Sequence, residues 1–168
     1  MHRLSRLLPS LLAFVLVSAA ENPFPPGPDS QTQEGVPQGE VLKGNYTAAN
    51  NSVFPGTIRS YSVYIPQQLD RSRPAPLMVL QDGGGYQAVN VFNNLIAKKQ
   101  IPPLVGIFIM HGRVPAQSTN ALDRFNRSLE YDGLGDAYAR FLLDEFLPFI
   151  ERTHGLQLST NPDDRAIG

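Results

Sequence analysis

The sequence has 168 residues, a formal net charge of −1, 42% hydrophobic residues and no cysteine. A nearly neutral chain has no strong field to attract nucleic acid, and the absence of cysteine excludes disulfides, a thiolate nucleophile and thiolate-bound zinc. The length and the hydrophobic content are sufficient for one domain that is held together by its core.

The first twenty residues have the pattern of a secretory signal peptide. Basic residues stand near the amino terminus, a mostly apolar run covers residues 7–17, and Ser18-Ala19-Ala20 offers small residues for cleavage. The apolar run is too short to span a bilayer. We therefore expect residues 1–20 to be removed and the mature protein to be secreted or periplasmic, without membrane or nucleic-acid partners. Residues 21–38 are rich in proline and predict an extended linker.

Strand patterns begin at residue 40. Segments 40–47 and 57–66 are strand-like, and the alternation of polar and apolar residues in the second is typical of an antiparallel strand near a sheet edge. Segments 76–80 and 104–110 are continuously apolar, as expected of central strands that are buried on both faces. Between these two, apolar residues recur at helical spacing over residues 89–96, which predicts a right-handed β–α–β unit.

The second half of the chain begins with a long polar connection over residues 111–132, and a connection of this length is usually either functional or disordered. A second helix is predicted after it, with Asp132 as its cap and Gly155 as its stop. Pro148 lies inside this helix and is expected to kink it near Asp144, because the carbonyl of that residue loses its N–H partner.

Residues 165–168 predict the start of a further parallel strand. Two antiparallel strands followed by alternating strands and helices predict an α/β fold, in the form of a three-layer α/β/α sandwich. The pattern alone predicts the fold class and no more.

Six segments match a known pattern in their order and spacing. They are Phe54–Thr57, Arg59–Pro66, Leu77–Gly83, Arg127–Tyr131, Phe141–Ile150 and Asp164–Gly168. Together they resemble the opening of the family named "Putative esterase", the branch of α/β-hydrolases that includes esterase D-like and enterochelin esterase-like enzymes. The resemblance extends over roughly residues 36 to 168.

Members of that family hydrolyse carboxylic esters with a Ser-His-Asp or Ser-His-Glu triad. Their serine lies in a G-x-S-x-G turn after a strand like the one that begins near Arg165. The resemblance implies an α/β-hydrolase domain over residues 39–168 that is truncated at a central strand, with the serine, the acid and the histidine beyond Gly168.

The chain is thus expected to be the N-terminal fragment of a secreted serine esterase, inactive by itself. The complete enzyme would act on a small-molecule ester and need no cofactor. Two alternatives stay open. One is a non-catalytic secreted binding module on the same half-fold, and the other is part of a longer esterase-gluconolactonase-type protein.

The segment Gln-Asp-Gly-Gly-Gly-Tyr at residues 81–86 follows the third predicted strand, where this fold places one donor of the oxyanion hole. Successive glycines let backbone N–H groups approach a substrate oxygen, so Gly83 and Gly84 are candidate oxyanion donors. A flexible turn is the structural alternative. Asp82 is expected to fix this loop by accepting hydrogen bonds from its backbone N–H groups.

Further side chains are candidates for the substrate pocket, with simple solvation as the alternative: Tyr86, His111, Arg113, Arg127 and Glu130. Arg127 and Glu130 match a family position, and we expect them to pair with each other or with the neighbouring backbone and to orient a loop beside the active site. An ordinary surface salt bridge is the alternative there. The histidines do not have metal-binding spacing, so no metal site is expected, and His154 is expected to favour a helix C-terminus.

Overall fold

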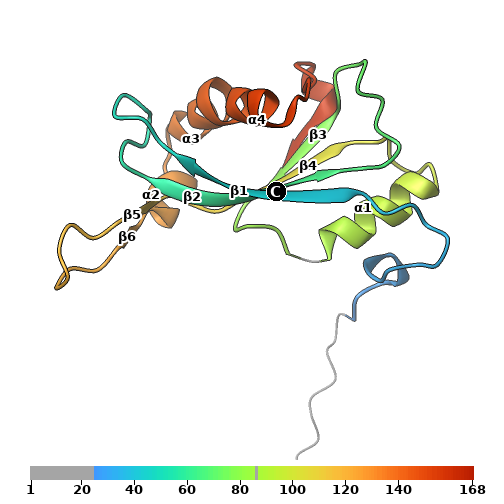
Figure 1. Ribbon diagram of the computed structural model, residues 1–168, viewed down its shortest axis with the longest axis horizontal. Coiled ribbons are helices and arrows are strands. Elements are labelled where there is room, and N and C mark those ends of the chain that lie inside the picture. The colour runs from blue at the N-terminus through green and yellow to red at the C-terminus, as the bar shows by residue number, and fades with distance from the viewer. Residues whose placement is uncertain (1–24, 86) are drawn as a thin grey trace, which may run out of the picture.

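The computed structural model describes residues 25–85 and 87–168, so the predicted signal peptide and the candidate Tyr86 lie outside the described residues. A seven-stranded mixed sheet runs through this part of the chain, with helices on both of its faces (Figure 1). The strands are β1 (Glu40–Thr47), β2 (Ile58–Ile65), β3 (Leu77–Leu80), β4 (Val105–Ile109), β5 (Arg113–Val114), β6 (Arg124–Phe125) and β7 (Arg165–Ile167). The predicted α/β class is confirmed.

The main part of the sheet has the order β1-β2-β4-β3-β7. Strands β1, β2 and β4 pair in antiparallel fashion, whereas β3 is parallel to both β4 and β7. Ile107 is the central residue, because it pairs with Val63 of β2 on one side and with Val79 of β3 on the other. All three are buried, as expected of apolar residues in central strands. The β-α-β unit is completed by α1 (Ala88–Ala97) between β3 and β4.

A continuous helical segment covers one face of the sheet. It consists of α3 (Ala137–Arg140), a π-helical turn η2 (Phe141–Phe146) and α4 (Leu147–His154). The predicted disturbance near Asp144 takes the form of this wider turn, which ends two residues before Pro148, a residue that cannot donate a backbone hydrogen bond. The helix ends where the sequence indicated, at Gly155, which has a left-handed φ of 60°. The predicted cap Asp132 is wrong, because the helix begins five residues later.

Helix α1 covers the other face over a smaller core that contains Tyr64, Phe92 and Phe108. A single 3-10 turn, η1 (Pro28–Ser30), lies beside this helix (Figure 1). The side-chain amide of the buried Asn94 donates to two backbone carbonyls of this segment, both at 2.8 Å. Part of the predicted linker is therefore attached to the domain and is more than a spacer.

The 111–132 connection is ordered in the structure. It contains the short hairpin of β5 and β6 and the helix α2 (Arg127–Tyr131), and the hairpin projects from the body of the protein (Figure 1). A connection of this length was expected to be either functional or disordered. The second of these possibilities is therefore excluded. No helix in the described part of the chain is long and apolar enough to cross a membrane.

Candidate active site

The glycine loop, defined here as residues 82–85, leaves the carboxyl end of β3 in a left-handed conformation. Asp82, Gly83 and Gly84 have φ values of 57°, 78° and 75°. A Cβ at Gly84 would overlap with Cδ1 of Phe108, and one at Gly83 would lie 2.6 Å from Sδ of Met110. The left-handed backbone favours glycine at both positions, and at Gly84 the contact with Phe108 of β4 leaves no room for a side chain.

The two candidate oxyanion donors differ in their hydrogen bonding. The amide nitrogen of Gly83 donates to the carbonyl oxygen of Ile109 at 3.1 Å, so this N–H is already used to hold the loop against β4. Within the described residues, the amide of Gly84 has no hydrogen-bond partner. Gly84 is exposed, so its N–H group is accessible from the solvent side of the loop. Gly84 is consequently the donor of the pair that is available to a ligand oxygen.

The side chain of Asp82 is held by a residue that lies outside the glycine loop. Its carboxylate accepts hydrogen bonds from Nε of Arg127 at 2.9 Å and from Nη2 at 2.5 Å. These bonds are the main reason that the pKa of Asp82 is lowered from its ordinary value. The expectation that Asp82 accepts from the backbone of its own loop is wrong, since among the described residues the donor to its carboxylate is the guanidinium of Arg127.

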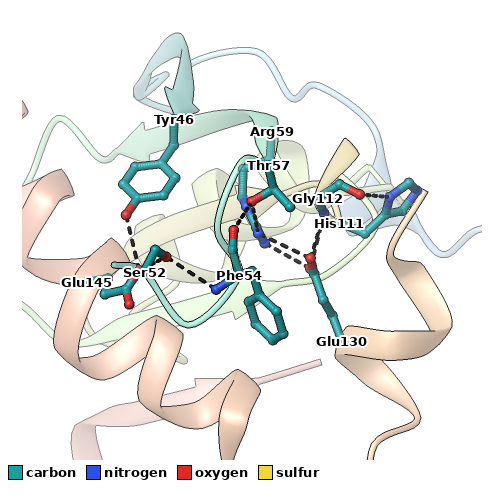
Figure 2. A network of polar contacts seen from close by, with 9 residues as sticks. All are labelled: Tyr46, Ser52, Phe54, Thr57, Arg59, His111, Gly112, Glu130 and Glu145. Carbon is teal, nitrogen blue, oxygen red and sulfur yellow. Dashed lines mark hydrogen bonds and ion pairs between the residues drawn. The ribbon is translucent and has the colours of Figure 1, made fainter. Parts of the chain in front are cut away.

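Glu130 lies in the interior, with Arg59 as its partner (Figure 2). Nη1 and Nη2 of Arg59 lie 2.9 and 3.2 Å from the two carboxylate oxygens, and the amide of Gly112 lies 3.1 Å from each oxygen. Both side chains are fully buried, and the guanidinium carbon lies 4.0 Å from the ring centre of Phe141. Arg127 and Glu130 therefore do not pair with each other. The other part of the expectation, a bond to nearby backbone, is met at Glu130, which accepts from the amide of Gly112. The Arg59–Glu130 pair is buried and is no surface salt bridge.

Arg59 was not a candidate from the sequence, although a signal was present. It occupies the same face of β2 as Tyr61 and Val63, which point into the core. A charged residue at an inward position of an alternating strand requires a buried partner. The sequence does not specify the partner, because Glu130 is 71 residues away.

His111 follows the end of β4 and lies beside the same network (Figure 2). Its Nδ1 is 3.3 Å from the carbonyl oxygen of Gly112, and its ring meets the rings of Phe125 and Tyr131 edge-on, with centres 5.7 and 6.5 Å away. The electrostatic interaction with His111 also contributes to the lowered pKa of Asp82. The candidates His111 and Arg127 are thus brought to the glycine loop, while Glu130 is behind them in the core and Arg113 pairs with Asp123.

Two adjoining hollows flank the glycine loop. They have volumes of about 300 and about 500 Å³ and share Ser62, Gly83 and Phe108. Polar side chains of β1 and β2 line the larger one, among them Lys43 and Asn45. Within residues 25–85 and 87–168, no cluster of three or more His, Cys, Asp or Glu side chains is placed to hold a metal ion.

The end of β7 lies at the same edge of the sheet as the glycine loop. The amide of Gly168 donates to the carbonyl of Val79 at 2.9 Å, and the amide of Gln81 donates to the carbonyl of Gly168 at 2.8 Å. Since β3 and β7 are parallel, the residues that follow each of them emerge side by side.

Solved structures of esterases share this fold. A ferulic acid esterase of the anaerobic fungus Anaeromyces mucronatus matches with a TM-score of 0.59 and 19% identity, over 83% of this chain and 52% of the esterase. The structure of that esterase in complex with ferulic acid matches similarly, with a TM-score of 0.58, 18% identity and coverages of 83% and 51%. A feruloyl esterase module of Clostridium thermocellum, complexed with sinapinate, has a TM-score of 0.50 and 17% identity over 86% of this chain and 50% of the module.

The chain spans about half the length of these esterases. A model of the family described as "Putative esterase" matches residues 52–167, which include the sheet from β2 to β7, the glycine loop and the 111–132 connection. The order of strands, the glycine loop and the family match agree, and the chain belongs to this esterase family.

Proposed function

We propose that this chain forms the N-terminal half of a secreted serine esterase and supplies one side of its oxyanion hole. One observation carries the proposal. The amide of Gly84 has no partner in the described part of the chain, and its loop lies beside the end of β7, after which this family places the nucleophilic serine. The N–H group of Gly84 and the serine would then lie close together, at the carboxyl ends of β3 and β7. The esterase domain would be a complete three-layer α/β/α sandwich.

The reaction follows from this arrangement. A serine in the segment after Gly168 attacks the ester carbonyl, and a histidine removes the proton of the hydroxyl group. The resulting oxyanion accepts hydrogen bonds from the Gly84 amide and from the amide after the serine. The tetrahedral intermediate then collapses, and the histidine gives its proton to the departing alcohol. Water, deprotonated by the same histidine, attacks the acyl-enzyme and releases the acid and the free serine. One such donor contributes about 3–4 kcal/mol to the stability of the transition state.

The half-length matches to esterases support a continuation that carries the serine, the acid and the histidine. The pattern of residues 1–20 supports secretion. For the substrate, we propose esters of aromatic acids. The similar esterases were solved with ferulic acid and with sinapinate, and an exposed aromatic ring, Phe125, contacts His111 beside the glycine loop.

The direct test is to read the encoding DNA beyond the codon for Gly168. The proposal expects an open frame that reaches G-x-S-x-G within a few residues, followed by an acid and a histidine. The same reading would show whether a gluconolactonase-type domain follows. A stop codon at that position would contradict the proposal, because the chain would then have no nucleophile in the position the reaction requires.

A non-catalytic binding module is the second candidate, and the two hollows beside the glycine loop favour it. The two functions predict different behaviour of the 168-residue chain. Half of an esterase exposes the unpaired edge of β7 and apolar side chains such as Ile167, and should aggregate. A binding module should be a monomer that unfolds cooperatively. Size-exclusion chromatography with light scattering, followed by urea denaturation, distinguishes the two.

A further inference from the structure

The short helix α2 connects the glycine loop to the core through two residues that lie one helical turn apart. Arg127, at its beginning, donates to the carboxylate of Asp82 in the glycine loop. Glu130, three residues later, accepts from Arg59 in the interior. The first pair is largely exposed and the second is fully buried. The helix therefore has one end fixed in the protein and one end in contact with the loop.

The buried end holds α2 firmly in place. Glu130 accepts from Arg59 and from the amide of Gly112, and a Cβ at Gly112 would overlap with Oε1 of Glu130. In addition, the amide of Asn126 donates to the carbonyl of Gly112 at 2.8 Å. These contacts join α2 to β2 and to the residue that precedes β5, so α2 cannot move independently of the sheet.

The glycine loop needs such a support. Three successive residues have positive φ, which glycine adopts freely, whereas the left-handed conformation of the non-glycine Asp82 is costly unless the surroundings impose it. Its backbone tether to β4 is the bond from Gly83 to Ile109. The guanidinium of Arg127 contacts both oxygens of Asp82, which fixes the direction of that side chain as well as its distance.

We propose that Arg127 is a positioning residue, which holds the glycine loop through Asp82 so that the N–H group of Gly84 points toward the ligand oxygen. This inference rests on the proposed function for its role in catalysis. The ordering of the loop itself can be measured without any ester, so a failure here is distinguishable from a failure of the esterase proposal.

The experiment uses the purified product of the complete reading frame that contains this chain, and follows backbone amides by nuclear magnetic resonance. In Arg127→Gln we expect the hydrogen exchange of the Gly83 amide to accelerate on the order of tenfold and the Gly84 signal to shift or broaden. Amides of the central strands, such as that of Ile107, should be unchanged. Arg127→Lys should restore part of the protection, because one charged donor remains. Asp82→Asn should have the same effect as Arg127→Gln.

Arg140→Gln is the matched control, because Arg140 also forms an exposed ion pair, with Asp136, but lies away from the loop. It should leave the Gly83 and Gly84 signals as they are. Unchanged loop amides in Arg127→Gln would overturn the proposal. Equal acceleration at Ile107 would also overturn it, since Arg127 would then act on global stability.

A pH titration measures a property that would not change if Arg127 only stabilised the fold. Within residues 25–85 and 87–168, the charged or titratable groups that face Asp82 are Arg127, His111 and Tyr131. The midpoint of the Gly83 shift should lie below the ordinary aspartate range and should rise toward it in Arg127→Gln. A midpoint that is the same in both proteins would contradict the proposal.

Discussion

Arg59 and Glu130 form an ion pair with both side chains fully buried, with 2.9 Å between Nη1 and Oε2. The pair joins β2 to α2 across 71 residues of sequence, and the ring of Phe141 covers its cationic side. A buried charge without its partner is far more costly than an exposed one. The position of the 111–132 connection therefore depends on this contact.

Removal of one partner tests that dependence. Glu130→Gln leaves the guanidinium of Arg59 buried without a counter-charge, and should lower the free energy of unfolding by about 3–5 kcal/mol. Urea denaturation of the product of the complete reading frame measures the change. Asp136→Asn breaks the exposed pair with Arg140 and should cost under about 1 kcal/mol. The double variant Arg59→Met/Glu130→Leu should recover part of the loss. A Glu130→Gln protein as stable as Asp136→Asn would contradict this account.

A substitution at Gly84 can separate two contributions to the free energy of unfolding. One is the strain of a left-handed backbone and the other is a close side-chain contact. Gly84→Ala forces alanine into φ +75° and places its Cβ against Phe108. Gly35 has the same φ of 75°, but a Cβ added there would meet nothing within 4 Å, so Gly35→Ala is the matched control. The control should lose about 1–2 kcal/mol from backbone strain alone. Gly84→Ala should lose about 1–3 kcal/mol more, from overpacking. Equal losses in thermal denaturation would show that the contact with Phe108 is unimportant.

Asn94 tests the attachment of the proline-rich segment. Asn94→Ala leaves the carbonyls of Asp29 and Gln31 without their donor and should cost about 1–3 kcal/mol. Lys98→Ala removes only a half-exposed ion pair with Asp29 and should cost under about 1 kcal/mol. Limited proteolysis gives an independent measurement, because cleavage within residues 25–38 should accelerate in Asn94→Ala and not in Lys98→Ala. Identical cleavage rates in both variants would mean that Asn94 does not hold the segment.

His154 should make stability depend on pH. It is the last residue of α4, where a positive charge is usually favoured, but burial lowers its pKa below the ordinary value. Its Nε2 lies 3.2 Å from the hydroxyl of Tyr61. A lowered pKa in the folded state means that stability is present above the unfolded pKa and is lost as the pH falls through the folded value.

The free energy of unfolding should therefore decrease as the pH falls below the ordinary histidine pKa of about 6.5, and His154→Gln should show a smaller decrease. Urea denaturation at several pH values measures both slopes. Parallel slopes for the two proteins would exclude His154 as a source of this dependence.

Much of the fold is local in the sequence and was predictable for that reason. The apolar runs that became β3 and β4 and the glycine that ends α4 each act through their own residue type and its immediate neighbours. The cap of the second helix was not predictable in the same way, because Asp132 and Asp136 are chemically equivalent candidates and the packing of the 111–132 connection decides between them.

The sequence predicted the loop of the candidate site but not the contacts that its residues make. Successive glycines identify the glycine loop, yet only the structure shows that the amide of Gly83 is already bonded to Ile109. Similarly, Arg127 and Glu130 are close in sequence, so a pair between them was a reasonable expectation. Their actual partners, Asp82 and Arg59, are 45 and 71 residues away, and only the sheet topology brings them together.

The measurement that tests the central proposal most directly is labelling with a fluorophosphonate, a reagent that forms a covalent adduct with activated serines. The 168-residue chain and the product of any longer reading frame would be treated in parallel and analysed by peptide mass spectrometry. The account predicts no adduct on any serine up to Gly168 and one adduct in the segment that directly follows it. An adduct on a serine of the 168-residue chain, such as Ser60 or Ser62, would contradict the account.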